Sequence, residues 1–150
     1  MIKESRENMT GKPYKLTSAE REVLEFLWDY GSPLTSARIV ELCTDRHWKD
    51  SYIHLIIQSL LKKEAITIAG FIPSGKNYAR TFSPAKTREE FVLEEILREY
   101  PEGEEMIPGL ISHLLDRVSD SRILDEIIEK CSARKEACNR TGDNTEKKDI

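Results

Sequence analysis

The residue types best suited to chemistry lie between residues 50 and 63, where a helical apolar pattern carries polar side chains on its other face. The apolar positions that predict the buried face are Ile53, Ile56, Ile57, Leu60 and Leu61. Helical geometry turns the remaining side chains outward, and these are Ser51, Tyr52, His54, Leu55 and Gln58. A face of this kind can bind base edges in the major groove of duplex DNA. An amide pairs with adenine, hydroxyl and imidazole groups donate to bases or phosphates, and an apolar group packs on the thymine methyl. The alternative is a solvated face, which Tyr52 and Leu55 suit poorly.

Basic side chains flank this helix and a hairpin that follows it, where they are expected to contact phosphates. They are Arg38, Arg46, Lys49 and Lys62, with Lys76 and Arg80 on the hairpin. The net charge of −4 discourages binding to nucleic acid, but the acidity is unevenly distributed. Residues 1–85 carry 12 basic and 10 acidic side chains, whereas residues 86–150 carry 11 and 17. The first half is therefore mildly basic, although any single cation also fits an ordinary surface position.

The residue types do not support an enzyme. The sequence has no glycine-rich phosphate loop, no nucleophile elbow and no clustered histidine or cysteine ligands, so we expect no catalytic residue, no metal site and no cofactor. Cys43 fits a small core residue. Cys131 and Cys138 are seven residues apart on one helix face, where they are either ordinary helix residues, the reading we favour, or part of a site completed by a partner.

No membrane or export segment is expected from the sequence. No window approaches the roughly 20 apolar residues that a membrane-spanning helix needs. The N-terminal residues include no apolar stretch, which argues against a secretory signal. We therefore expect a cytoplasmic protein that does not insert into membranes.

The elements expected to position the polar face are three helices followed by a β-hairpin. A first helix begins at Thr17, whose spacing to Glu20 is that of a capping box, and ends at Gly31. A short second helix begins near Thr35 or Ser36, and the third begins near residue 50. Alternating residues 65–69 and 77–83, joined by a turn signal at residues 73–76, predict the hairpin. This order is that of a winged helix-turn-helix.

The second half is predicted to be helical, from Thr87 to Tyr100, from about Pro108 to Arg117 and from about Asp120 to Ala137. These short helices carry more apolar surface than they can bury alone, so a second copy of the chain is the simplest partner. The expected interface residues are Phe91, Ile96, Leu97, Leu110, Ile111, Leu114, Ile123 and Ile127. The predicted organisation is a flexible arm (1–13), a winged-helix domain (14–85), a helical dimerisation region (86–138) and a disordered tail (139–150). The fold class is mainly α with a small β-hairpin.

An ordered set of residues resembles the penicillinase-repressor family. The opening pattern is Leu16-Thr17-x-x-Glu20-x-x-Val23-Leu24-x-x-Leu27-Trp28-x-x-Gly31. It is followed by Leu34–Val40, by Trp48 ahead of the third helix, by Gly75–Pro84 and by Arg88-Glu89-Glu90-Phe91. The resemblance is best over residues 14–95 and rests on helix order beyond them. It implies a homodimeric repressor that binds a palindromic operator through the winged helix and dimerises through the C-terminal helices.

The resemblance also carries expectations about control. Resistance members of the family are cleaved when an upstream membrane sensor is triggered, but their Asn-Phe cleavage dipeptide aligns with Ser112-His113 here. Copper-responsive members carry a Cys-x-Cys signature that this chain lacks. On the third helix, a usual threonine aligns with Leu55 and a usual arginine with Ser59. An alternative function is therefore a winged-helix module that binds a protein through Tyr52 and Leu55 and has lost sequence-specific DNA binding.

Overall fold

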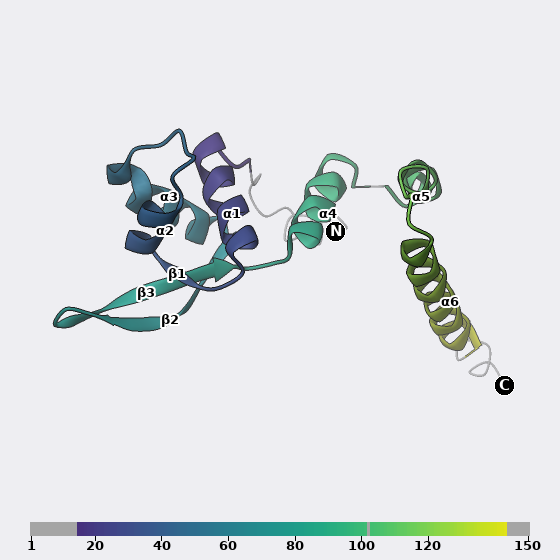
Figure 1. The fold of residues 1–150 in the computed structure, drawn as a ribbon. Coiled ribbons are helices and arrows are strands. Elements are labelled where there is room, and N and C mark those ends of the chain that lie inside the picture. The colour runs from purple at the N-terminus through teal and green to yellow at the C-terminus, as the bar shows by residue number, and fades with distance from the viewer. Residues whose placement is uncertain (1–14, 102, 144–150) are drawn as a thin grey trace, which may run out of the picture. The chain divides into compact units, whose positions relative to one another are not determined.

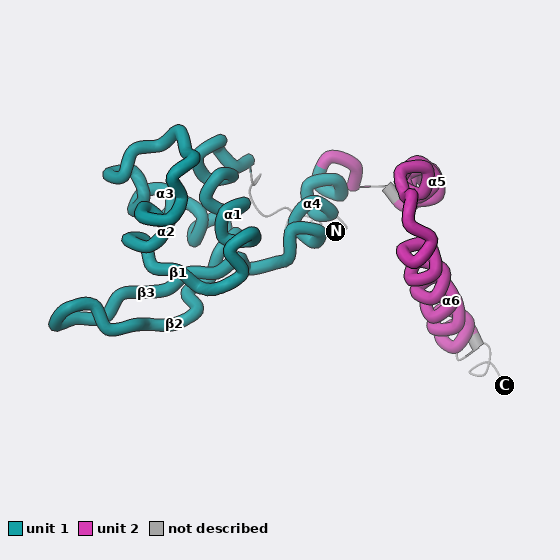
Figure 2. The backbone as a smooth tube through the Cα atoms, in the orientation of Figure 1, with its two compact units in different colours: residues 1–98 teal, residues 99–150 magenta. Residues whose placement is uncertain are grey.

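The computed structural model describes residues 15–101 and 103–143, and the chain divides into two compact units, residues 1–98 and 99–150 (Figure 2). The predicted arm at residues 1–13 lies outside the described part. The elements are α1 (Ser18–Tyr30), β1 (Leu34–Thr35), α2 (Ser36–Leu42), the 3₁₀ turn η1 (Asp50–Tyr52), α3 (Ile53–Lys62), β2 (Ile66–Ser74), β3 (Asn77–Pro84), α4 (Arg88–Glu99), the 3₁₀ turn η2 (Gly103–Met106), α5 (Ile107–Leu115) and α6 (Ser121–Asp143) (Figure 1).

Local signals at both ends of α1 determine its length. The Thr17 hydroxyl accepts from the Glu20 amide, and the Glu20 carboxylate accepts from the Thr17 amide, so the predicted capping box is confirmed. At the other end, Gly31 adopts a left-handed conformation at φ 75°, and its amide donates to the Leu27 carbonyl. This conformation strains a residue with a Cβ atom, which explains the glycine at this position.

The core of the first unit lies among α1, α2, α3 and the sheet. Its members include Val23, Leu24 and Leu27 from α1, Ile39 from α2, Ile53, Ile56, Ile57 and Leu60 from α3, and Phe82 from β3. The apolar stripe predicted for α3 is thus buried, apart from Leu61, which is half-buried. The third helix begins as the η1 turn at Asp50 and becomes α-helical at Ile53.

The sheet has three antiparallel strands in the order β1-β3-β2, so the fold is mainly helical with a small sheet, as predicted. The hairpin is longer than expected, because pairing continues past Ala69 through a bulge between Ile68 and Gly70. Gly75, at φ 61°, opens its two-residue turn. The two-residue strand β1 pairs with β3 and was not predicted, since so short a segment has no periodicity of its own.

Helix α4 belongs to the first compact unit, which extends to Arg98, whereas the division into a DNA-binding domain and a dimerisation region after residue 85 stays a prediction. Its N-terminus has a second capping box, between Thr87 and Glu90. Phe91, predicted at a dimer interface, is 6% exposed and packs edge-on against Trp28 of α1, with ring centroids 5.5 Å apart. It is therefore a core residue of the first unit.

The second unit has no core of its own among its described residues: every described side chain from Tyr100 onward is exposed or half-buried. The predicted interface residues Leu110, Ile111, Leu114 and Ile123 are exposed, and Ile127 is half-buried. Helix α6 continues to Asp143, so residues 139–143 are helical and the tail predicted to begin at residue 139 is corrected. The rest of that tail lies outside the described part.

Candidate nucleic-acid interface

The outward face of α3 presents the side chains that the sequence analysis singled out. Ser51, His54 and Gln58 are exposed, and the exposed fractions of Tyr52 and Leu55 are 51% and 61%. No partner for these side chains lies within the described residues. Donors, acceptors and one apolar side chain therefore lie together on one face of a helix whose opposite face is held in the core.

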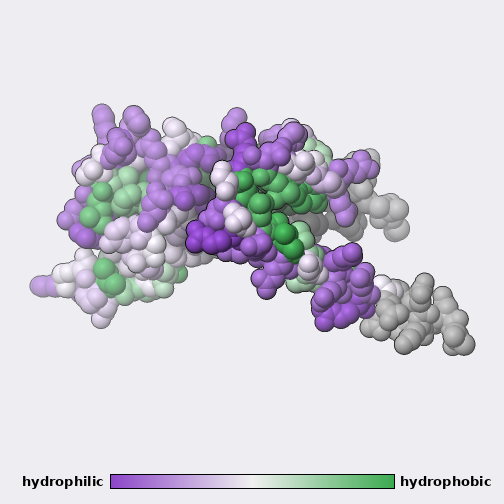
Figure 3. All heavy atoms as spheres, turned by 45° about the vertical axis from the view of Figure 1, so that its right-hand side comes forward, coloured by the Kyte–Doolittle hydropathy of each residue, from purple (hydrophilic) through white to green (hydrophobic). Residues whose placement is uncertain are grey.

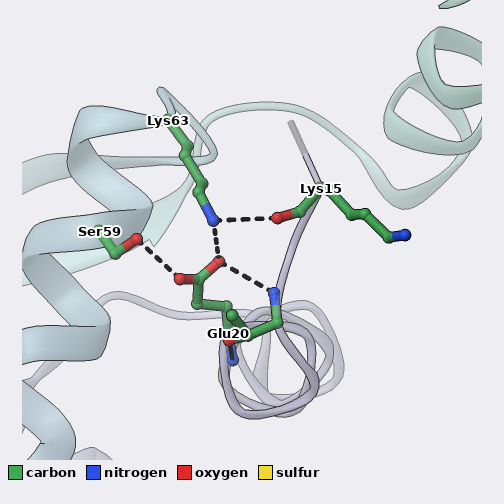
Figure 4. Close-up of polar contacts among 5 residues, drawn as sticks. Lys15, Glu20, Ser59 and Lys63 are labelled. Carbon is green, nitrogen blue, oxygen red and sulfur yellow. Dashed lines mark hydrogen bonds and ion pairs between the residues drawn. The ribbon is translucent and has the colours of Figure 1, made fainter. Parts of the chain in front are cut away.

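A buried carboxylate ties the C-terminal part of α3 to the start of α1 (Figure 4). Glu20 is 5% exposed, and its carboxylate accepts from the Ser59 hydroxyl at 2.7 Å and from the Lys63 ammonium at 2.6 Å. Lys63 also donates to the Lys15 carbonyl at 3.0 Å. Because two helices share one charged network, it fixes how α3 sits against α1.

These contacts outweigh the cost of burying the Glu20 charge. Burial by itself raises the pKa of Glu20, but hydrogen bonds from Lys63, Ser59 and the Thr17 amide lower it below the usual 4.5. The carboxylate is therefore charged at neutral pH. The sequence predicts only a capping role for Glu20, although this residue lies three, four and seven residues before Val23, Leu24 and Leu27 and so shares their buried stripe.

Ser59 has a structural role in this network. Alignment with the family had placed a DNA-contacting arginine at this position, but the hydroxyl turns toward α1 and the residue is half-buried. Residue 59 therefore lies at the border between the buried face of α3 and the outward face that Leu55 and Gln58 share, and its hydroxyl is engaged with α1.

The loop before α3, residues 43–49, is held by Arg46, which was predicted to contact phosphate. Its side chain is 12% exposed, lies 4.0 Å from the Trp48 ring centroid and forms an ion pair with Asp50. It also donates to the Cys43 carbonyl at 2.7 Å and to the Trp48 carbonyl at 2.6 Å. We therefore correct the assignment: Arg46 shapes the loop and is not available to DNA. Nothing in the spacing of the polar residues along the sequence predicts that Arg46 shapes this loop.

His47 fastens the same loop to α1. Its ring nitrogen Nδ1 lies 2.7 Å from the Glu22 carboxylate, which also accepts from the His47 amide at 3.1 Å. The hydrogen bond and charge of Glu22 raise the pKa of His47 above 6.5. The loop that leads into α3 is thus held at two points, because His47 contacts α1 and Arg46 pairs with Asp50 at the start of η1.

The other predicted cations are exposed around α3 and the hairpin. Lys49, Lys62 and Lys76 have no ion-pair partner among the described residues, whereas Arg38 pairs with Glu41 at 2.6 Å. Arg80 is exposed, with its guanidinium 5.5 Å from the Phe82 ring centroid. Residues 51–88 carry six basic side chains and one acidic side chain, Glu64. The segment that includes α3 and the hairpin is therefore locally cationic in an acidic chain.

The described residues were compared with the requirements of a metal site and of a membrane-spanning helix. Within that part of the chain, no group of three histidine, cysteine or acidic side chains is placed to hold a metal ion. No helix there combines the length and apolar character needed to cross a bilayer. Cys43 is buried, and burial raises the pKa of its thiol, as expected of a core residue, while Cys131 and Cys138 are exposed.

Comparison with known proteins identifies the family of this chain. The model of the penicillinase repressor family matches residues 16–130, which include both α3 and the hairpin. No curated protein sequence matches the chain. One similar solved structure is the adhesin competence repressor of Streptococcus pyogenes, with 15% identity and a TM-score of 0.38, covering 88% of this chain and 89% of that one. On the family match, the chain belongs to the penicillinase repressor family of DNA-binding, winged-helix transcriptional regulators.

Proposed function

We propose that the protein is a homodimeric repressor that binds a palindromic operator with α3 in the major groove and the β2–β3 hairpin beside it. The observation that carries this is the outward face of α3. It presents hydrogen-bonding side chains that have no partner among the described residues, in a segment, residues 51–88, with a single acidic side chain. Recognition helices need this combination of a fixed inner face and free base-reading groups. The site of action would be the cytoplasm.

The side chains divide into two roles. In this docking Gln58 pairs with adenine, His54 and Ser51 donate to bases or phosphates, and Leu55 packs on a thymine methyl. Tyr52 is exposed on the same face and contributes to the contact with DNA. The positioning contacts to phosphates come from the remaining exposed cations, Arg38, Lys49, Lys62, Lys76 and Arg80.

The dimer is supported by the second unit, whose described side chains bury no core. Ile107, Leu110, Ile111 and Leu114 follow one stripe of α5, and all are exposed. Apolar side chains also form continuous green areas on the outside of the chain in Figure 3. Such surface is costly in water, and a second copy would cover it.

We expect light scattering at micromolar concentration to give twice the chain mass of 17.3 kDa. Ile111→Asp should produce monomers, because it places a charge in the apolar stripe. Ser112→Asp is the matched control, since it adds the same charge to the same helix about 100° away from Ile111. A wild-type particle of 17.3 kDa would contradict the dimer, and equal effects of the two variants would contradict an interface on the Ile111 stripe of α5.

DNA binding is tested by selecting bound fragments from the source genome at near-physiological salt. We expect a short palindrome. Gln58→Ala should cost about 1–3 kcal/mol and relax preference at one position, whereas Lys76→Ala should weaken binding to all sequences and reduce the salt slope by about one. This mode of docking would be wrong if folded, dimeric protein selected no sequence, or if neither variant changed the affinity for DNA.

The second candidate function is a protein-binding module, which the exposed Tyr52 and Leu55 favour. The two functions differ in their response to salt. Binding to DNA releases counterions and weakens steeply as salt rises, whereas an apolar contact through Leu55 changes little. Titration of any captured partner between low and physiological salt therefore separates them.

A further inference from the structure

Helix α3 exposes an apolar side chain on the face that otherwise presents polar groups. Among the residues of α3, all of which the structure describes, Leu55 is the only exposed apolar side chain, at 61%. Tyr52, three residues earlier, is 51% exposed and is a neighbour of Leu55 on the helical surface. Exposed apolar side chains that adjoin one another are typical of a contact surface. We refer to Tyr52 and Leu55 as the apolar patch.

Hydrogen-bonding and charged side chains border the apolar patch. Gln58 and Lys62 follow Leu55 at intervals of three and four residues, so the three side chains form one line along the outside of α3. All three are exposed, whereas the opposite face of the helix is held in the core of the first unit. Because the helix moves as one body, a surface that Gln58 reads also lies against Leu55.

The chemistry of the major groove selects the group that Leu55 contacts. The apolar group that duplex DNA offers there is the methyl at C5 of thymine, and the hydrogen-bonding groups are the ring N7, the carbonyl oxygens and the amines. Leucine has no donor or acceptor, so Leu55 gains nothing from O4 of thymine or N4 of cytosine. A cytosine that is methylated at C5 presents the same apolar group at the same ring position. Leu55 therefore contacts the methyl group of either base.

We propose that the protein reads the 5-methyl group of pyrimidines through Leu55, so that methylation of cytosine strengthens its binding to an operator. The inference rests on the proposed DNA binding and adds to it a class of ligand, the C5-methylated pyrimidine, and a means of regulation. At the base pair that Leu55 covers, a methylated C·G pair binds more tightly than an unmethylated one. The affinity for an operator therefore depends on the methylation state of the DNA as well as on its sequence.

The expected effect is moderate for each half-site and larger for the palindrome. Burying one methyl group strengthens binding by a factor of about four. Two copies of Leu55, one on each half-site, therefore contribute about fifteenfold together. The amide pair that Gln58 makes with adenine is worth about 5- to 150-fold. Methylation thus adjusts the affinity for an operator that Gln58 and the surrounding cations already select.

The test uses duplexes that share the selected operator and differ at one pyrimidine in each half-site. Each thymine is first replaced by uracil, which lacks only the methyl group, and the replacement that weakens binding identifies the position that Leu55 covers. Cytosine and 5-methylcytosine are then compared at that position, both opposite guanine. Fluorescence anisotropy should show about fifteenfold tighter binding for thymine over uracil and for 5-methylcytosine over cytosine. Leu55→Ala should reduce both ratios to about twofold, whereas Leu55→Met, which stays apolar at similar volume, should keep them.

His54→Ala is the matched control, because His54 is exposed and is the neighbour of Leu55 in the same helix. It should weaken binding to all the duplexes alike and keep both ratios, and melting curves should show that all the variants fold. Three outcomes would each overturn the inference and leave operator binding intact: no effect of uracil at any thymine, no difference between cytosine and 5-methylcytosine, or full ratios in Leu55→Ala. Failure to bind any duplex would overturn the proposed function itself.

Discussion

Replacing Glu20 by alanine is expected to lower the free energy of unfolding of the first unit by about 3 kcal/mol, because it leaves the Lys63 ammonium without its carboxylate partner and removes a capping interaction. For a unit of this size the melting temperature should fall by at least about 12 °C. The measurement is thermal unfolding followed by circular dichroism. Affinity for the selected duplex should fall as well, since the same network orients α3.

The matched control for this prediction is Glu22→Ala. Glu22 lies on the same helix and is also ion-paired, but its partner His47 is highly exposed, so the variant should melt close to the wild type. Equal destabilisation by the two variants would show that burial of the Glu20 network is irrelevant.

The pH dependence follows from the lowered pKa of Glu20. A carboxyl group whose pKa is lowered by folding binds fewer protons in the folded state, so its stabilising contribution is complete above the unfolded value of 4.5. That contribution is lost as pH falls through the folded value. The stability advantage of the wild type over Glu20→Gln should therefore be constant above about pH 5.5 and shrink below pH 4.5.

Replacing Trp28 by alanine should release α4 from the first unit and cost about 2 kcal/mol, less than for a fully buried tryptophan, because Trp28 is half-buried. The indole packs on Phe91, its Nε1 donates to the Lys86 carbonyl at 2.8 Å, and the Arg88 guanidinium lies 5.4 Å from its ring centroid. Hydrogen exchange of the α4 amides should become faster than in the wild type.

Ion pairs also hold α4, which makes Trp28→Phe an informative control. Arg88 pairs with Glu25 and Asp29, each at 2.7 Å, and Arg21 pairs with Glu95 at 2.7 Å. Trp28→Phe keeps an aromatic ring against Phe91 and loses only the N–H donor, so it should cost about 1 kcal/mol. If α4 exchanges at the wild-type rate in Trp28→Ala, the ion pairs alone are sufficient to dock this helix.

Docking of α4 also matters for the proposed dimer, because this helix is where the chain leaves the first unit. A released α4 should weaken binding to a full palindrome more than binding to an isolated half-site. The ratio of these two affinities in Trp28→Ala therefore reports on how the two copies of the first unit are positioned in the dimer. The half-site affinity alone reports on the contacts that α3 makes with DNA.

The amino-acid sequence by itself determined the features that depend on neighbours along the chain. The capping box of Thr17 and Glu20, the stop at Gly31 and the outward face of α3 all follow from spacing within one or two helical turns. The hairpin turn at Gly75 follows from local conformational preference. Such features can be predicted without knowledge of the fold, because the interacting residues are already close in the chain.

Only the tertiary structure decided which distant groups share a partner. Glu20 meets Ser59 and Lys63, which are 39 and 43 residues away, and Phe91 meets Trp28 across the boundary that the sequence had suggested. Even Arg46, whose partners are nearby, is withdrawn from the surface by the path of its loop around Trp48. Charge and apolar character show that a side chain needs a partner, but several partners satisfy the same need. Packing of the whole unit selects one partner for each side chain. The alternative pairings are disfavoured because they would leave buried charges or exposed apolar surface uncompensated.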